Sequence, residues 1–276
     1  MPRSAGGRFS ARAGGLVLLA LCLLGLAAPL FAPADPLATA LEERLRPPDD
    51  AHPLGRDALG RDVLSRLLYG ARVSFVVGVA TLFISLLIGV TLGATAGWVG
   101  GWLDEALVRV IDVFLAFPGL LLAIALAAVL GPSLANVVLA LSVLGWPSYA
   151  RLARTEVAGL RRREFVHAAE ALGARPARIV LAHILPLAVP TLLVQATFGI
   201  AGAIVAEASL SFLGLGVAPP TPSWGGMIAE GRTFMLVAPH VILFPGLALA
   251  ATVLALQLLG DGLRDVLDVR EEGRRR

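Results

Sequence analysis

Lysine is absent from the 276-residue chain, and all 23 basic residues are arginine. This absence excludes a P-loop, because the lysine of that motif reaches the β- and γ-phosphates of ATP. The chain therefore does not hydrolyse ATP itself. Cysteine is also scarce, and the single Cys22 excludes a disulfide framework and a cysteine metal cluster.

Charge is low as well. Charged residues make up 16% of the chain, hydrophobic residues make up 57%, and the mean hydropathy is +0.80. This composition is typical of an integral membrane protein. The net charge of +3 does not indicate a nucleic-acid partner, because the arginines are confined to segments between apolar runs. No pair of acids and no His/Cys cluster suggests hydrolysis or a bound metal, so we expect no cofactor.

The apolar runs predict an all-α fold with six transmembrane helices, since one crossing takes about 20 residues. We expect the spans at 13–34, 73–95, two within 113–150, 187–206 and 237–259. Gly131-Pro132-Ser133 is the predicted turn between the third and fourth, and Trp98 and Trp102 mark an interfacial turn. The first run also resembles a cleavable signal, with Ala32-Pro33-Ala34 as the cleavage site. We favour a retained span, because Pro33 is unfavourable beside such a site.

The arginines are distributed unevenly between the two sides of the membrane. Sixteen lie in segments on the side of both termini and the 151–183 loop, and seven lie on the opposite side. The positive-inside rule assigns the sixteen to the cytoplasm, with both termini. The predicted organisation is a cytoplasmic N-terminus and first span (1–34), an outer segment (35–71), a five-helix core (72–260) and a cytoplasmic tail (261–276) that frays.

Two outer segments are rich in turns. The first repeats Leu-Gly-Arg-Asp at 54–57 and 59–62, and then predicts an amphipathic helix with Val63, Leu64, Leu67 and Leu68 as its apolar stripe. That helix either lies flat in the membrane interface or forms a docking surface. The second segment, 211–232, is Gly/Pro-rich, with Trp224 as an amphipathic anchor.

The longest cationic interruption is 151–190, and it contains a short predicted helix over 164–172. Phe165, Ala168, Ala169 and Leu172 recur at helical spacing and share one face. Gly173 stands at the position after a helix C-terminus, and Pro176 disfavours helix at Arg175, so the helix stops there. From these residues alone, the segment is either a loop that only fixes topology or a helix shaped for a partner.

The same segment resembles the EAA motif in the permease subunits of binding-protein-dependent ABC importers. It reads His167-Ala168-Ala169, then Gly173, then His183-Ile184-Leu185-Pro186. Histidine stands at 167 where the family has glutamate, and His183 displaces the family's isoleucine. Stretches 52–72, 115–131, 207–228 and 258–268 are similar to the C-type permeases of dipeptide, oligopeptide and nickel importers. The resemblance covers nearly the whole chain from about Asp35 to Asp268.

The resemblance implies a subunit of the bacterial inner membrane that couples ATP hydrolysis by partner subunits to cargo import. The implied partners are a related B-type permease, two cytoplasmic ATPases that bind the ATP, and an extracytoplasmic substrate-binding protein. The implied cargo is a di- or oligopeptide, with nickel or an opine-like molecule left open. The implied coupling loop is 151–186, with coupling residues Glu164, His167, Ala168, Ala169, Leu172, Gly173, Leu185 and Pro186. We predict that Ala169→Glu uncouples transport from ATP hydrolysis.

Glu207 and Gln195 are the polar residues of the fifth run that we weigh for the translocation path. Glu207 follows 23 uncharged residues, so within the hydrocarbon it would face the bundle or a water-filled path. Alternatively, Glu207 lies at the outer membrane–water interface. Gln195 is a weaker candidate, because such a residue more often joins helices by hydrogen bonds. A secondary transporter is the competing class, but the two halves of the chain show no internal repeat.

Overall fold

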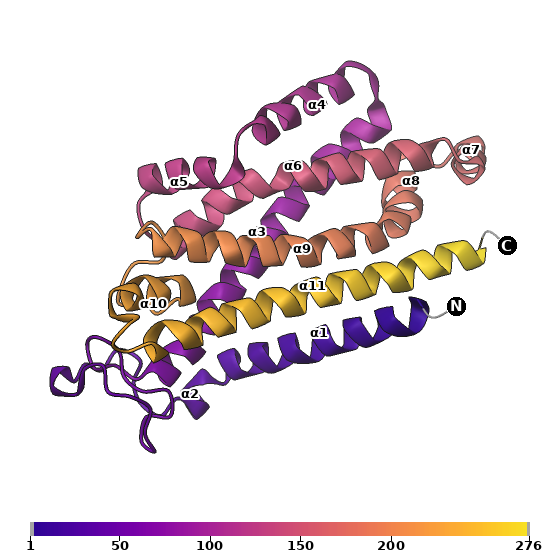
Figure 1. The fold of residues 1–276 in the computed structure, drawn as a ribbon. Coiled ribbons are helices and arrows are strands. Elements are labelled where there is room, and N and C mark those ends of the chain that lie inside the picture. The colour runs from indigo at the N-terminus through magenta and orange to yellow at the C-terminus, as the bar shows by residue number, and fades with distance from the viewer. Residues whose placement is uncertain (1–2, 275–276) are drawn as a thin grey trace.

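The computed structural model describes the backbone of residues 3–274 and the side chains of residue 7 and residues 9–267. Throughout this part of the chain every regular element is a helix, apart from an isolated antiparallel bridge between Arg56 and Asp62. The all-α prediction is therefore confirmed (Figure 1). The helices are α1 (Arg3–Leu26), α2 (Ala28–Phe31), α3 (Val63–Val99), α4 (Gly101–Ala116), α5 (Gly119–Leu130), α6 (Leu134–Arg161), α7 (Glu164–Ala171), α8 (Pro176–Ile179), α9 (Leu185–Phe212), α10 (Trp224–Gly231) and α11 (His240–Arg274). Short 3-10 turns cover Leu41–Glu43 and Arg232–Phe234, and a π turn covers Val180–Ile184.

Four helical stretches are long and apolar enough to cross a membrane: Phe9–Leu26, Val63–Val99, Pro176–Phe212 and His240–Leu267. A fifth crossing results if α4 and α5, bent by 85° at their junction, are taken as one broken span. The structure is consistent with the predicted count of six without confirming it, because α6 does not pass the same test of length and hydropathy.

The run at 113–150 does not divide as predicted. It breaks first at Phe117 and Pro118, between α4 and α5, and only then at 131–133. Phe117 is extended (ψ 142°) because the proline ring disfavours helix in the residue before it. The predicted turn at 131–133 is present, but the helix before it is bent at Pro118 and is not one straight span. The predicted turn between Trp98 and Trp102 is present and short. Gly100 alone separates the two helices, and α4 begins at Gly101.

The pair α3 and α6 makes the most extensive helix contact among the described residues. Gly89, Gly93 and Gly97 lie one turn apart on α3, facing the backbone of α6. A Cβ atom at any of them would overlap a carbonyl oxygen of α6, from Trp146, Ala150 or Arg154 respectively. Small residues let membrane helices approach this closely, where van der Waals packing holds them together.

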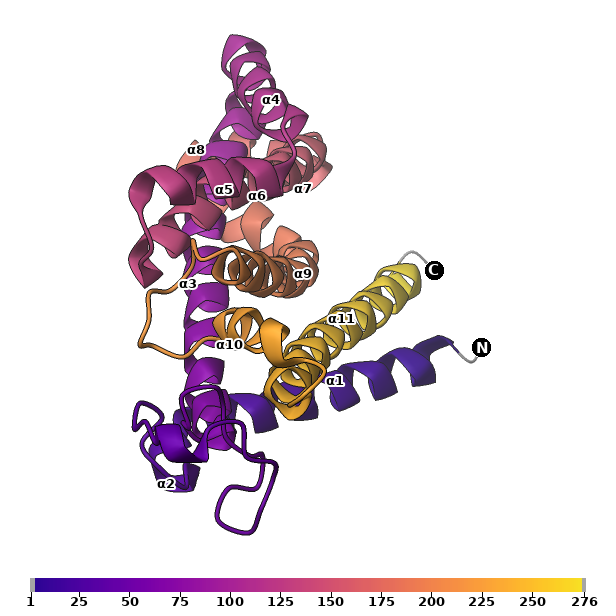
Figure 2. The same cartoon turned by 60° about the vertical axis from the view of Figure 1, so that its left-hand side comes forward.

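A second close pair is formed by α1 and α11, which run side by side in both views (Figures 1 and 2). Gly14 packs against the Ala255 carbonyl, and Gly262 packs against the backbone of α1. The helix α11 continues to Arg274, so the prediction that the tail frays from Asp261 is wrong for the described residues. The predicted sixth span also began too early, because Val237 precedes the helix.

The ends of the bundle differ in character. Both termini and α7 lie at one end, whereas α2, the irregular segment 32–62 and α10 lie at the other (Figure 1). We call these the α7 end and the cap end. The helix predicted after residue 62 is present, but it does not lie flat by itself, because those residues form the first turns of the continuous α3. Arg66, which lies outside the predicted apolar stripe, is 2% exposed.

Candidate functional site

The ends of α7 follow the signals in its sequence. The N–H of Ala174 donates to the Ala169 carbonyl at 3.0 Å, and the N–H of Gly173 donates to the Glu170 carbonyl at 2.9 Å. Together these bonds form a Schellman motif, with Gly173 in the left-handed region at φ +79°. Arg175 is extended and Pro176 opens α8. The predicted helix end is confirmed, whereas residues 151–161 of the predicted loop are the last turns of α6.

A buried cluster at the α7 end holds α7 in place. Val166 is fully buried against Ala94 of α3, Val157 of α6, and Ile179 and Ile184 of the segment leading into α9. We call this set the α7 seat. Leu185 and Ala169 pack against its edge, each partly buried. Val166 therefore places α7 against α3, α6 and the segment that leads into α9.

The opposite face of α7 is exposed. Of the four residues predicted to share an apolar face, Phe165, Ala168 and Leu172 are exposed, and Leu172 is 88% accessible. Ala169 turns partly toward the seat. Glu164, His167 and Gly173 are exposed as well, and His167 lies 3.5 Å from Glu170 one turn on. Pro186 is exposed at the start of α9. The outward face is thus small and apolar, with a charged rim.

A cavity of about 250 Å³ lies between α3, α5, α6 and α9. Its wall includes Gln195, as weighed from the sequence. The other polar side chains in the wall are hydroxyls, and glycines from α5, α6 and α9 provide much of the remaining surface. These residues are Thr81, Ser85, Ser148, Tyr149, Gly119, Gly145, Gly199 and Gly202. The wall carries no ionisable group apart from the Tyr149 phenol.

Glu207 is buried within the bundle and does not border this cavity. It is fully buried, and its Oε1 accepts a hydrogen bond of 2.7 Å from the Ser211 hydroxyl. Ser223, at the start of α10, is a second hydroxyl partner of this carboxylate. Gly225 of α10 packs against the backbone of the next residue, Ala208, so Glu207 belongs to the contact between α9 and α10.

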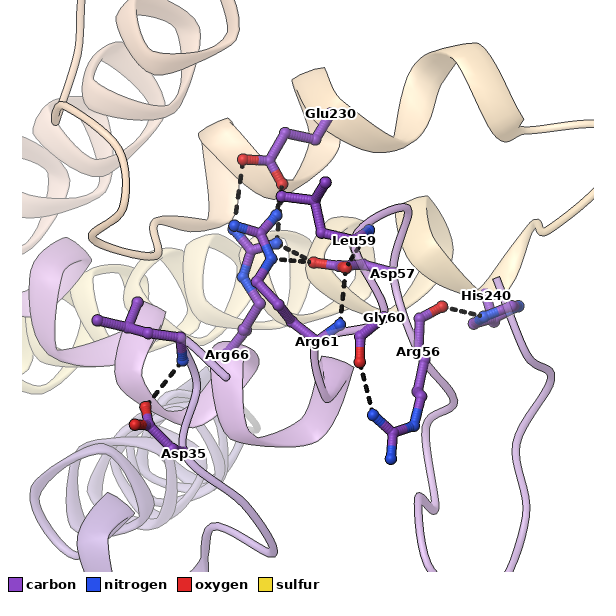
Figure 3. A network of polar contacts seen from close by, with 10 residues as sticks. Asp35, Arg56, Asp57, Leu59, Gly60, Arg61, Arg66, Glu230 and His240 are labelled. Carbon is purple, nitrogen blue, oxygen red and sulfur yellow. Dashed lines mark hydrogen bonds and ion pairs between the residues drawn. The ribbon is translucent and has the colours of Figure 1, made fainter. Parts of the chain in front are cut away.

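Four charged side chains form a cluster at the cap end (Figure 3), in which Asp57, Arg61 and Arg66 are buried and Glu230 is partly exposed. Asp57 accepts from Arg61 Nε at 2.7 Å and also from Arg66. Both arginines continue to Glu230 of α10, at 2.6 Å from Arg61 and 2.8 Å from Arg66. Two guanidinium groups and two carboxylates balance in charge. We call this set the arginine–carboxylate cluster.

The Leu-Gly-Arg-Asp repeat builds the turns around that cluster. Gly55 and Gly60 both have positive φ, at 76° and 74°. The first aspartate, Asp57, enters the cluster. The second, Asp62, caps α3 by accepting from the Ser65 N–H at 2.6 Å. His240 lies 3.1 Å from the Arg56 carbonyl and so joins α11 to the cap.

Comparison with known proteins decides the family. Residues 89–272 match the model of the binding-protein-dependent transport system inner membrane component. The chain belongs to this family. It is thus a non-enzymatic permease subunit of an ABC importer, a multi-pass protein of the inner membrane that works with an ATPase and a substrate-binding protein.

The permease is also similar to curated relatives over most of its length. It is 48% identical to the glutathione transport system permease protein GsiD of Salmonella paratyphi A over 262 residues, covering 95% of this chain and 86% of the relative. It is 51% identical to GsiD of Shigella flexneri serotype 5b over 226 residues, covering 82% of this chain and 75% of the relative.

Sequence reasoning about the permease did not find the arginine–carboxylate cluster. Arg61 and Arg66 lie in the predicted outer segment 35–71, and Glu230 lies in the Gly/Pro-rich segment 211–232. A signal was present in the repeat, because a paired Gly-Arg-Asp sets two turns with equivalent charged positions. The partner on α10 carries no such signal, since Glu230 is 164 residues away from Arg66.

Proposed function

We propose that this permease transmits ATPase closure through α7 to the helices that enclose its cavity. The observation that carries the proposal is a shared set of helices. The α7 seat contains residues of α3, of α6 and of the segment that leads into α9. The cavity is lined by other residues of α3, α6 and α9. On α3, Ala94 of the seat and Thr81 of the cavity are separated by about 20 Å of continuous helix. Displacement of α7 therefore moves the cavity wall.

The exposed face of α7 is the proposed docking surface for the ATPase. Phe165 and Leu172 supply apolar contact, Ala168 allows close approach, and Glu164 and His167 border them. Four exposed arginines surround the helix, and their charge would pair with acids on the ATPase: Arg162, Arg163, Arg175 and Arg178. ATP is bound by the two ATPase subunits.

The proposed path is completed by a related permease of the B type. Large apolar side chains on α5 are exposed, among them Leu121 at 63% and Val129 at 86%, and they offer surface to lipid or to that second permease. The arginine bias supports a cytoplasmic α7 end and cytoplasmic termini. The cap end then faces the substrate-binding protein.

The proposed cargo is a short peptide, and glutathione is the first to test, because the relatives at 48–51% identity are named glutathione permeases. A cavity wall of hydroxyl and amide groups is compatible with a peptide backbone. Nickel and other small solutes remain the alternative cargo.

The test is uptake in cells that lack this chain and are complemented with it. Radiolabelled glutathione, an unmodified dipeptide and nickel are offered separately. Glutathione or dipeptide uptake that needs both the chain and ATP supports the proposal. Uptake of nickel alone would reassign the cargo, and uptake independent of ATP would overturn the coupling.

A further inference from the structure

Two buried hydroxyl groups in the cavity wall lack hydrogen-bond partners. Thr81 is 5% exposed and Tyr149 is 3% exposed, and neither Thr81 Oγ1 nor the Tyr149 hydroxyl has a partner among the described residues. Buried hydroxyls are nearly always paired, so each unpaired one invites an explanation.

Other hydroxyls on the same helices pair with the backbone. On α3, Thr91 donates to the Leu87 carbonyl at 2.6 Å, and Thr95 donates to the Thr91 carbonyl at 2.7 Å. A threonine hydroxyl on a helix can thus donate a hydrogen bond to the backbone carbonyl one turn earlier. Thr81 lies on the same helix beside the cavity and does not do so.

The space around these hydroxyls is kept open by glycine. The Tyr149 hydroxyl lies directly over Gly199 of α9, and a Cβ atom there would overlap it. One turn further, a Cβ atom at Gly202 would meet nothing within 4 Å. Gly199 and Gly202 both line the cavity, so the tyrosine sits at the edge of open volume.

The polar groups of the wall are of one chemical kind. Hydroxyls and the Gln195 carboxamide both donate and accept hydrogen bonds, and none carries a charge at neutral pH. A charged group of the cargo would find no counter-charge there, which makes its burial costly. An amide group of a peptide, with one donor and one acceptor, matches the wall.

We infer that Thr81, Tyr149 and Gln195 form a contact site for the uncharged amide groups of a peptide cargo during its passage. The inference rests on the proposed function and adds the groups of this chain that touch the cargo. Because the cavity is small, the site holds part of the peptide at a time, and the charged ends remain outside it.

The test uses the full transporter, with both permeases and the ATPases in proteoliposomes and the binding protein loaded with radiolabelled glutathione. The readout is glutathione imported per ATP hydrolysed. Tyr149→Phe and Thr81→Val each delete one hydroxyl at nearly constant volume, and Gln195→Met deletes the amide. We expect each to lower the ratio about fivefold, the usual effect of one lost hydrogen bond. Thr91→Val, which deletes a self-satisfied hydroxyl on α3, should stay within about twofold of wild type.

A second measurement does not depend on those variants assembling. In a Cys22→Ser background, Ser148→Cys places a thiol in the cavity wall, and Thr155→Cys places one on the exposed surface of α6. Binding protein loaded with S-methylglutathione, which has no free thiol to consume the reagent, should together with ATP slow alkylation of the first thiol and leave the second unchanged.

The outcomes separate the two proposals. If wild type imports glutathione but the three variants match it and the Ser148→Cys thiol is not protected, the contact site is wrong and the proposed function stands. If wild type imports no short peptide, both fall.

Discussion

Arg66, in the first turns of α3, and Glu230, near the end of α10, are 164 residues apart in sequence, and Arg66 Nη1 lies 2.8 Å from Glu230 Oε2. Arg66 also contacts Asp57, so one guanidinium joins the cap, α3 and α10 (Figure 3). The Trp224 indole adds a second link, donating to the Leu67 carbonyl at 3.0 Å. The helix α10 is therefore fixed to the outer turns of α3 by both charge and packing.

Removal of Arg66 should destabilise the permease strongly. Arg66→Leu leaves Asp57 and Glu230 with Arg61 as their remaining cationic partner, and the loss of a hydrogen bond to a charged group costs about 1.5–3 kcal/mol. The measurement is thermal unfolding in detergent. Arg151→Leu is the matched control, because Arg151 and Asp112 form an exposed pair at 2.6 Å whose loss costs about 1 kcal/mol or less. Equal unfolding temperatures for the two variants would contradict a structural role for the cluster.

Ala168→Glu should uncouple ATP hydrolysis from uptake. Ala168 is exposed on the outward face of α7, so a glutamate there obstructs the ATPase without disturbing the seat. We expect uptake to fall at least about tenfold, equivalent to about 1.4 kcal/mol, while ATP hydrolysis continues. The measurement is import and hydrolysis in the same proteoliposomes.

Ala169→Glu, predicted from the sequence to uncouple, should act differently. Ala169 packs partly against the seat, so the added carboxylate displaces α7 itself and lowers assembly as well as uptake. Ala177→Glu, on the exposed surface of α8, is the control for added charge. Wild-type uptake by Ala168→Glu would remove the docking role of that face.

Gly93→Ala should loosen the contact between α3 and α6. Its Cβ atom would overlap the backbone carbonyl of Ala150. A backbone group cannot rotate out of the way as a flexible side chain can, so the two helices must separate. Overpacking of this kind costs about 1–3 kcal/mol. Gly159→Ala is the control. Gly159 lies on α6, and a new Cβ atom there would meet nothing within 4 Å, so its effect on the free energy of unfolding should be neutral or stabilising. Unfolding of both variants in detergent checks the difference, and equal stabilities would contradict the close approach.

Side-specific labelling checks the proposed orientation. With Cys22 replaced by serine, the chain contains no other cysteine, so single thiols can be introduced. Leu172→Cys lies at the α7 end and Leu41→Cys lies at the cap end, and both positions are exposed. A membrane-impermeant maleimide added to whole spheroplasts should label the second alone. Labelling of Leu172→Cys from outside would reverse the orientation and remove the coupling role of α7.

Mass measurement of the purified permease checks the predicted retention of the first span. The helix α1 packs along α11 through Gly14 and Gly262, and this contact supports a retained helix. The expected mass is that of a chain that still contains residues 13–34. A shorter chain beginning near Asp35 would show that the run is a cleaved signal.

Local signals in the sequence predicted α7 well. Its end depends on Gly173 and Pro176, both of which act on the backbone within a few residues, so no tertiary contact had to be known. The apolar spacing of Phe165, Ala168 and Leu172 identified a real face. That spacing alone did not show whether the face is buried, and in the isolated subunit it is exposed, while Val166 occupies the seat.

The burial of Arg66 depends on tertiary contacts that local sequence signals do not show. Arg66 counted as polar in the expected amphipathic helix, but a buried arginine is stable when carboxylates from Asp57 and Glu230 surround it. The break at Pro118 had a local signal in Phe117-Pro118-Gly119. The same uncharged run carries a more polar turn at 131–133, and the length of the run alone favours a single division at that turn.

The π turn at Val180–Ile184 sets the angular relation between α7 and the cavity. In it, the N–H of Leu185 donates to the Val180 carbonyl, five residues back instead of four. The π turn thus holds one residue more than an α turn and takes up that residue locally, so the helical phase is kept on either side of it. A residue added to the ordinary α turns of α9 that follow would instead rotate everything upstream by about 100°, the step of one residue. Val166 would then leave its seat although no residue of the seat had changed. The helical phase between α7 and the cavity therefore decides whether a push on α7 reaches the membrane helices.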